Sequence, residues 1–139
     1  MSFLLDTNVV SEWIRPSPNA GLVAWTDSVD EDRIFLSTVT VAEVRHGIDR
    51  LPSGARRKRL DLWLRDELIP RFEGRILPID GDVADLCGQI LARQEAAGHR
   101  IEAMDAFIAA TAVRHDLTLV TRNVADFRIA VASLLCPWT

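Results

Sequence analysis

The sequence predicts an α/β protein with a mostly parallel sheet, and two observations support this prediction. Short apolar runs that suit buried strands alternate along the chain with stretches in which apolar residues recur at helical spacing. The 139 residues, of which 48% are hydrophobic and 26% charged, suit one compact core. No internal repeat, low-complexity tract or long linker divides the chain, so we expect a single domain over residues 1–139.

The first elements are predicted to be one strand and two short helices. Phe3–Leu5 is an apolar run of the kind that forms a buried strand. Apolar residues then recur at helical spacing over residues 9–14, with Thr7 or Asn8 as the N-cap, until two prolines end the helix. A second short helix is expected over residues 22–29.

The middle of the chain is predicted to add a second strand and two longer helices. Ile34–Ser37 has a strand pattern, and the β-branched residues 38–40 are expected to carry that strand into a turn. One helix is expected over residues 41–51. Another is expected over residues 55–69, and Pro70 ends it.

The last part of the chain is predicted to supply the remaining strands. A third strand is expected over residues 75–79, followed by a long helix over residues 83–97 that ends at Gly98. A helix rich in small residues is expected over residues 105–115. The chain then closes with a strand at 117–120, a polar turn at 121–127 and an edge strand at 134–136.

Composition limits both the function and the cellular location. The net charge of −4 argues mildly against a dedicated nucleic-acid binder, although four acidic residues in a metal-filled pocket would leave the remaining surface nearly neutral. Cys87 and Cys136 lie in apolar stretches and form no CxxC pair, so we expect buried, reduced thiols in a cytoplasmic protein. We expect no secretory signal before Phe3 and no membrane span.

Four acidic residues are predicted to lie at the ends of elements rather than on solvent-facing sides. Asp6 follows the first strand, Glu43 opens the helix after the second, Asp105 opens the helix before the fourth, and Asp126 lies in the turn after it. Parallel strands bring such residues to one edge of the sheet, where ligands bind in α/β folds. Clustered carboxylates repel one another unless a cation neutralises them, and oxygen ligands suit Mg²⁺ or Mn²⁺. A divalent ion held in this way suggests hydrolysis of phosphodiester bonds.

Each of these residues also has a purely local interpretation. Asp6 and Asp105 suit helix N-caps, residues 40–43 have the spacing of a capping box, and Asp126 suits a turn. Taken singly, the cap or the turn is the simpler explanation in every case. The two roles are compatible, because a helix N-terminus favours a carboxylate electrostatically.

Four sequence blocks contain these acidic residues. They are LLDTNVVSE at residues 4–12, TVAEVRHGI at 40–48, MDAFIAATA at 104–112 and TRNVADF at 121–127. In this order they resemble the PIN-domain family, and within it the VapC-type toxins of bacterial toxin–antitoxin pairs. Each block alone is a weak signal, but the four together are specific and extend over nearly the whole chain. The segments PRF at 70–72 and RILP at 75–78 resemble the FitB-like subgroup most.

The resemblance implies a PIN-like three-layer α/β/α sandwich with a central, mostly parallel sheet of four to five strands. It also implies that the four acidic residues line a catalytic metal site for Mg²⁺ or Mn²⁺. Asp6 and Asp105 would be the strongest ligands, whereas Glu43 and Asp126 would act directly or through water. Thr121 would hold Asp6 or the substrate. The supporting polar residues would be Asn8, Thr121 and Asn123.

The chain departs from the family pattern in the loop before Asp105. The family often has a proline there, whereas this chain has the sequence RIEA at residues 100–103. The loop geometry is therefore expected to differ. Glu102 adds a further negative charge without removing any ligand.

Basic and aromatic residues suggest contacts with partners. Arg45, Arg122 and Arg128 are candidates for contact with RNA phosphates. The run Arg56–Arg59 has two open interpretations: it grips phosphates, or it is a solvated helix start balanced by nearby acidic residues. Three tryptophans at helical spacing favour the core or an interface over base stacking: Trp13, Trp25 and Trp63. The resemblance implies an apolar groove among the first helices that receives an antitoxin helix.

We therefore expect a Mg²⁺- or Mn²⁺-dependent endoribonuclease toxin that acts on structured RNA such as tRNA and is neutralised by a cognate VapB-type antitoxin. The resemblance also implies a homodimer and a toxin–antitoxin assembly that contacts operator DNA through the antitoxin. One alternative is a catalytically silent PIN-like binding module that acts through the antitoxin and operator-DNA complex. Another is a metal-dependent phosphatase or receiver-type switch, but the chain has no P-loop motif and no second acidic residue beside Asp6.

Overall fold

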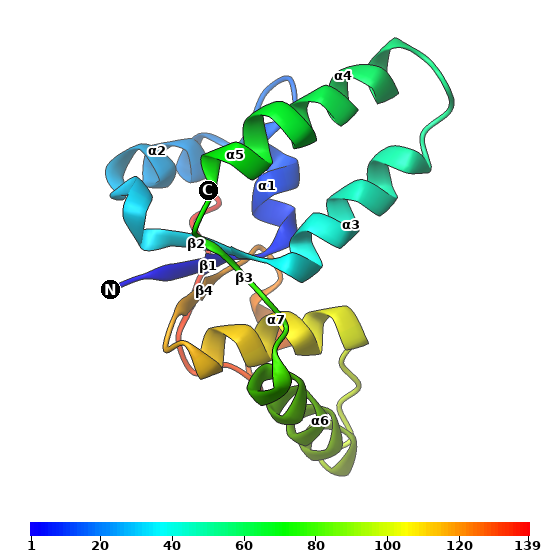
Figure 1. Cartoon of the computed structure of the whole chain (residues 1–139). Coiled ribbons are helices and arrows are strands. Elements are labelled where there is room, and N and C mark those ends of the chain that lie inside the picture. The colour runs from blue at the N-terminus through cyan, green and yellow to red at the C-terminus, as the bar shows by residue number, and fades with distance from the viewer.

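A computed structural model describes all 139 residues and shows a three-layer α/β/α sandwich around a five-stranded sheet (Figure 1). Every strand pairing is parallel, and the strand order is β3-β2-β1-β4-β5. The predicted architecture is therefore confirmed, and the sheet is parallel throughout. The strands are β1 (Phe3–Leu5), β2 (Ile34–Ser37), β3 (Ile76–Leu77), β4 (Thr118–Val120) and β5 (Leu134–Leu135).

Two helical layers cover the sheet, one on each face (Figure 1). One layer contains α6 (Gly81–Ala96) and α7 (Ala103–Arg114), and α8 (Val124–Phe127) packs into the same core. The opposite layer is larger: α1 (Thr7–Trp13), α2 (Ala20–Ser28), α3 (Thr38–Asp49), α4 (Ala55–Trp63) and α5 (Ile69–Arg71). Among all these helices, none combines the length and the apolar character needed to cross a membrane.

The central strand β1 explains why both layers are needed. Successive strand residues point to opposite faces, so Leu4 joins the core beneath α6 and α7 whereas Leu5 joins the core beneath α1 and α3. Both leucines are fully buried. β1 pairs with β2 on one side and β4 on the other, and the Asp6 N–H continues the pairing by donating to the Val120 carbonyl at 2.9 Å. Asp6 therefore lies at the middle of the sheet's carboxyl edge.

Strand β2 spans Ile34–Ser37 as predicted, but a helix capped by Ser37 follows it where a turn was expected. The Ser37 hydroxyl accepts a hydrogen bond from the Val39 N–H at 3.0 Å, and residues 38–40 form the first turn of α3. The cap thus outweighs the strand preference of these β-branched residues. Glu43 consequently lies in the second turn of α3, and the capping box predicted at residues 40–43 is wrong.

Three further local predictions of helix boundaries change in the structure. The N-cap of α1 is Asp6, which confirms the local interpretation of Asp6 as a cap and excludes Thr7 and Asn8 from that position. Glu102 occupies the N-cap position of α7, which begins at Ala103, so Asp105 is a first-turn residue and does not cap the helix. The predicted polar turn contains the one-turn helix α8, in which Asp126 lies.

The helix predicted to end before Pro70 instead continues to Arg71. It changes form along its length, because a π-helical segment, η2 (Leu64–Leu68), joins α4 to α5. Pro70 then lies in the first turn of α5, where a residue without an N–H is tolerated. The third strand is also shorter than predicted and spans only Ile76–Leu77.

The two cysteines differ in exposure. Cys87 is buried in α6, as predicted, whereas Cys136 is exposed, and the prediction of a buried thiol there is wrong. The reason is that Cys136 directly follows the two-residue edge strand β5 and therefore lies outside the core.

Candidate metal and catalytic site

Asp6 is buried at the carboxyl edge of β1 and is held by three hydrogen bonds. Its Oδ1 accepts from the Thr7 N–H at 2.8 Å, which makes Asp6 the cap of α1. Its Oδ2 accepts from the Thr121 hydroxyl at 2.7 Å and from the Asn8 amide at 3.2 Å. Burial raises the pKa of Asp6, repulsion from Glu43 and Asp126 adds to that rise, and the hydrogen bonds from Thr121 and Thr7 oppose it.

Thr121 ties the end of β4 to the start of α1. Besides donating to Asp6, its hydroxyl oxygen accepts from the Asn8 side-chain amide at 3.3 Å and from the Asn123 N–H at 3.0 Å. The Asn8 carbonyl oxygen in turn accepts from the Arg122 N–H at 3.3 Å. Asn123 therefore contributes through its backbone, which also accepts from the Asp126 N–H at 3.1 Å. The supporting polar residues thus form one connected network.

Glu43 reaches the same edge from α3 and is held by Thr7, a residue for which the sequence predicts only a possible cap. The Thr7 hydroxyl donates to Glu43 Oε1 at 2.6 Å and lies 3.2 Å from the hydroxyl oxygen of Thr40. Thr40 is fully buried. The position of Thr7 directly after Asp6 is the one signal in the sequence that was available to identify it.

Asp105 lies in the first turn of α7, on the opposite helical layer. Partial burial, followed by repulsion from Asp6, Glu43, Asp126 and Glu102, raises its pKa to about 6. The other three predicted carboxylates therefore all lie close enough to act electrostatically on Asp105. The contribution of Glu102 agrees with the extra negative charge predicted in the preceding loop.

The acidic edge, defined here as Asp6, Glu43, Asp105 and Asp126, contains no cationic side chain. None of its four carboxylates forms an ion pair, although seven ion pairs occur elsewhere in the chain. No three His, Cys, Asp or Glu side chains lie close enough together to hold a metal ion jointly, so the four carboxylates share an edge without closing around one point. Their oxygen-only donor set and mutual repulsion fit a hard divalent cation such as Mg²⁺ or Mn²⁺.

The predicted RNA-contact arginines fall into two groups. Arg45 is already engaged, with ion pairs to Asp49 at 3.1 Å and to Asp61 at 2.8 Å, and these hydrogen bonds raise its pKa. Arg122 and Arg128 are exposed and form no ion pair, and the backbone of Arg122 is bonded into the Asp6 network. The geometry therefore favours Arg122 over Arg45 as a residue available to a phosphate.

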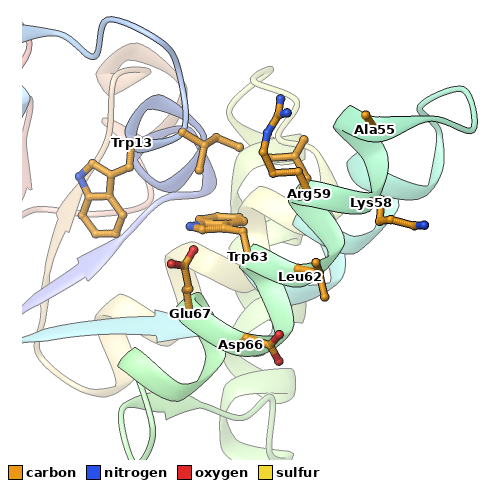
Figure 2. Close-up of a pocket in the computed structure, with 10 residues that line it drawn as sticks. Trp13, Ala55, Lys58, Arg59, Leu62, Trp63, Asp66 and Glu67 are labelled. Atoms are coloured by element: carbon orange, nitrogen blue, oxygen red, sulfur yellow. The ribbon is translucent and has the colours of Figure 1, made fainter.

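An apolar groove of about 760 Å³ lies between the end of α1 and the helix α4. Figure 2 shows Trp63 projecting from α4 toward Trp13 on α1, with Leu62 beside it. Leu62 is 46% exposed and Ile14 36% exposed, and both line this groove, so they belong to one apolar surface. Of the basic run, Lys58 and Arg59 line the groove, together with Asp66 and Glu67. Trp13 and Trp63 are half-buried, in agreement with the predicted core or interface role.

Similarity to known proteins extends over the same residues. Residues 3–130 match the profile of the PIN domain. The chain is 44% identical over 135 residues to the toxin FitB of Neisseria gonorrhoeae, a match that covers 97% of each chain. It is 36% identical over 135 residues to the VapC ribonuclease Y4jK of Sinorhizobium fredii, which covers 97% of this chain and 96% of that protein.

Solved structures resemble this one along its whole length. A FitAB complex bound to an IR36 DNA fragment contains a chain that superposes with a TM-score of 0.92 at 42% identity, covering 99% of this chain and 96% of that one. A chain of DNA-bound VapBC from Salmonella typhimurium superposes with a TM-score of 0.77 at 24% identity, covering 97% of each chain. The second likeness concerns the fold alone.

Proposed function

This chain belongs to the PIN-domain family, and we propose that it is a Mg²⁺- or Mn²⁺-dependent endoribonuclease toxin of a VapBC-like toxin–antitoxin system. One observation carries the proposal: four carboxylates from distant segments lie along the carboxyl edge of the sheet, and none of them forms an ion pair with a cationic side chain. The relatives that match nearly the whole chain are named as a toxin and as a ribonuclease, which supports this function. Strands from both ends of the chain share one sheet, which supports a single domain over residues 1–139.

The residues of this chain would divide the reaction between holding a cation and presenting the phosphodiester. Asp6 and Asp105 would be direct ligands, and Glu43 and Asp126 would act directly or through water. When bound, the divalent cation supplies activation of water and neutralisation of charge that develops on the phosphate. Thr121 and Asn8 keep the Asp6 carboxylate in one orientation, because three donors fix its two oxygens.

RNA would approach the acidic edge past the exposed arginines of the segment after β4. Arg122 and Arg128 flank Asp126 in sequence and have no carboxylate partner, so both are free to pair with phosphate oxygens. Such contacts would also offset the repulsion between RNA and the acidic edge. The ion pairs of Arg45 exclude it from this role unless they break.

The apolar groove between α1 and α4 would receive a helix of the antitoxin. Its lining combines exposed apolar residues with charges of both signs at the rim, which suits one apolar face of an amphipathic helix. Chains 42% and 44% identical to this one have been solved as FitAB bound to a DNA fragment and as FitAcB, which supports an antitoxin partner. The proposed assembly is a homodimer of this chain bound by its antitoxin, with operator DNA contacted by the antitoxin.

Cleavage of structured RNA by the antitoxin-free chain tests the proposed activity. We expect cleavage with Mg²⁺ or Mn²⁺, none with EDTA, and a loss of at least about 100-fold in Asp6→Asn and Asp105→Asn. Asp27→Asn is the matched control, because Asp27 is exposed on α2 and forms no hydrogen bond or ion pair. Metal-independent cleavage, or full activity in both site variants, contradicts the proposal and favours a silent binding module.

A substitution in the groove tests the proposed antitoxin site separately. Leu62→Glu adds a charge at a side chain that is 46% exposed, so the fold should tolerate it while an apolar helix face should not. We expect antitoxin affinity to fall at least about tenfold, measured by calorimetry, with RNA cleavage retained. Val113→Glu, on α7 in the opposite layer and 44% exposed, is the matched control. Equal antitoxin affinity in Leu62→Glu and Val113→Glu would exclude this groove as the antitoxin site.

A further inference from the structure

Thr7 donates hydrogen bonds to two of the four carboxylates at the acidic edge. Its N–H donates to Asp6 Oδ1 at 2.8 Å, and its hydroxyl donates to Glu43 Oε1 at 2.6 Å. The two acceptors come from segments that are far apart in the chain, the end of β1 and the second turn of α3. Thr7 therefore places one neutral donor residue between two like charges, and this arrangement fixes where Glu43 lies relative to Asp6.

The local structure does not require the Thr7 hydroxyl. The first turn of α1 is already capped by Asp6, which accepts from the Thr7 backbone, so the hydroxyl is free for a tertiary contact. A hydroxyl has a single proton to donate. The charged Glu43 oxygen at 2.6 Å is a stronger acceptor than the neutral Thr40 hydroxyl at 3.2 Å, so the proton goes to Glu43.

Thr40 and the second oxygen of Glu43 complete the arrangement. Thr40 is fully buried on the first turn of α3 and packs its hydroxyl against that of Thr7, which restricts the rotation of Thr7. Glu43 Oε2 accepts no hydrogen bond from the protein, so one oxygen of this carboxylate is held and the other stays available.

We propose that Thr7 is a positioning residue for Glu43: its hydroxyl holds Oε1 so that Oε2 is presented, with little freedom, to a divalent cation or to the water around it. This inference rests on the proposed metal-dependent function of the acidic edge. Thr7 itself touches neither the cation nor the RNA. Partners that hold ligand side chains in this way typically change metal affinity or activity by about 10- to 100-fold when removed.

A double-mutant cycle in EDTA tests the hydrogen bond itself, without any activity. Thr7→Val removes the donor at nearly constant volume, and Glu43→Ala removes the acceptor. We expect Thr7→Val to change the unfolding equilibrium constant about fivefold more in the wild-type background than in the Glu43→Ala background, as urea denaturation measures it. Thr38→Val is the matched control, because Thr38 is exposed on α3 and forms no hydrogen bond. Additive effects of Thr7→Val and Glu43→Ala overturn the proposal.

Mn²⁺ binding and cleavage kinetics test the positioning role. Without RNA, we expect Mn²⁺ affinity measured by calorimetry to fall about tenfold in Thr7→Val and to recover to within about threefold in Thr7→Ser, which restores the hydroxyl. With RNA, kcat should follow the same order while KM stays unchanged. Wild-type affinity and kcat in Thr7→Val, or no recovery in Thr7→Ser, would overturn the positioning role. If the wild type neither binds Mn²⁺ nor cleaves RNA while the cycle shows coupling, the proposed function fails and the Thr7–Glu43 contact stands.

Discussion

Carboxylates occur in two contrasting settings in this molecule. Glu31, before β2, receives a two-pronged hydrogen bond from Arg71 at 2.7 and 3.1 Å, with Arg75 at 3.4 Å, and the Arg71 hydrogen bond leads the effects that lower its pKa. Asp105, at the acidic edge, forms no ion pair, and its partial burial, followed by repulsion from other carboxylates, raises its pKa to about 6. The same chain thus neutralises one carboxylate with arginines and leaves four others without a cation.

The contrast shows which carboxylates serve the fold. Arg75 is 15% exposed and donates to the carbonyls of Glu31 and Ile34, both at 2.6 Å, so the arginine cluster (Glu31, Arg71 and Arg75) joins the entry of β2 to the end of α5. Arg71 also lies 4.5 Å over the ring of Trp13. The acidic edge has no comparable compensation, and its repulsion is unfavourable for the metal-free fold. We infer that the edge is kept for a diffusible cation and not for stability.

The sharpest way to break this comparison is to remove one carboxylate from each setting. Asp6→Asn should lower RNA cleavage at least about 100-fold, whereas Glu31→Gln should leave kcat within about threefold of the wild type. The physical reason is that only Asp6 belongs to the proposed ligand set. Steady-state cleavage of structured RNA well below the unfolding temperature measures both. Equal losses in the two variants would mean that the acidic edge acts through the fold alone.

The reverse experiment removes a positively charged side chain from the arginine cluster. Arg75→Met removes the guanidinium that lies 4.8 Å over the Phe72 ring and donates to the carbonyls of Glu31 and Ile34, of which only the Glu31 carbonyl keeps a second donor, the Ile34 N–H. We expect a loss of about 2 kcal/mol in the free energy of unfolding, measured by urea denaturation. Arg93→Met is a suitable control, because Arg93 is exposed on α6 and forms no ion pair. A loss no larger than that of the control would show that the cluster contributes little.

A divalent metal ion should stabilise the fold through the acidic edge and not through the arginine cluster. At a concentration tenfold above its dissociation constant, Mg²⁺ or Mn²⁺ should stabilise the wild type by about 1.4 kcal/mol and raise Tm accordingly. The increase should persist in Glu31→Gln and disappear in Asp105→Asn. Calorimetric melting with metal and with EDTA measures it. A similar increase in Asp105→Asn would place the bound cation away from the acidic edge.

The arrangement of the carboxylates could be predicted largely from order along the chain. Asp6 follows an apolar run, and parallel connectivity places the residues after each strand at one edge, so chain order predicts the place of Asp6 and Asp126, whereas their metal-binding role rests on the family resemblance. Glu43 lies at the predicted edge of the sheet, but it lies in the second turn of its helix and not at the predicted start. The β-branched residues 38–40 suit a strand locally, and only the Ser37 cap makes them helical.

Contacts between distant segments could not be predicted in this way. The bond from Thr7 to Glu43 and the ion pair from Arg45 to Asp61 depend on how α3 packs against α1 and α4, which no local pattern encodes. The second contact engages Arg45, which the sequence offered as a candidate for contact with RNA. The π-helical turn before Pro70 is of the same kind, since it rests on tertiary packing of Leu64 and Leu68.

The smallest expected effect is the most diagnostic, because it concerns stability without metal. Asp105 has a pKa of about 6 in the folded state against an ordinary value of 3.8, so the folded state binds its proton more tightly than the unfolded state does. Ionisation above pH 6 therefore destabilises the fold, and below the ordinary value both states are protonated and the effect vanishes. Asp105→Asn should thus raise the free energy of unfolding by about 1 kcal/mol at neutral pH in EDTA, after allowance for solvent screening and the lost helix-terminus charge.

The pH profile of that gain separates the cost of ionising Asp105, which arises from burial and from repulsion, from any general effect of the substitution. The gain from Asp105→Asn should shrink between pH 6 and pH 4 and be absent below pH 4, as urea denaturation across that range measures it. Glu31→Gln should behave in the opposite sense: the lowered pKa of Glu31 makes its contribution present at neutral pH and lost on acidification. A gain from Asp105→Asn that is equal at every pH would trace to packing or helix propensity. A loss at neutral pH would assign Asp105 to the fold, because mutual repulsion among the carboxylates can only make its removal favourable.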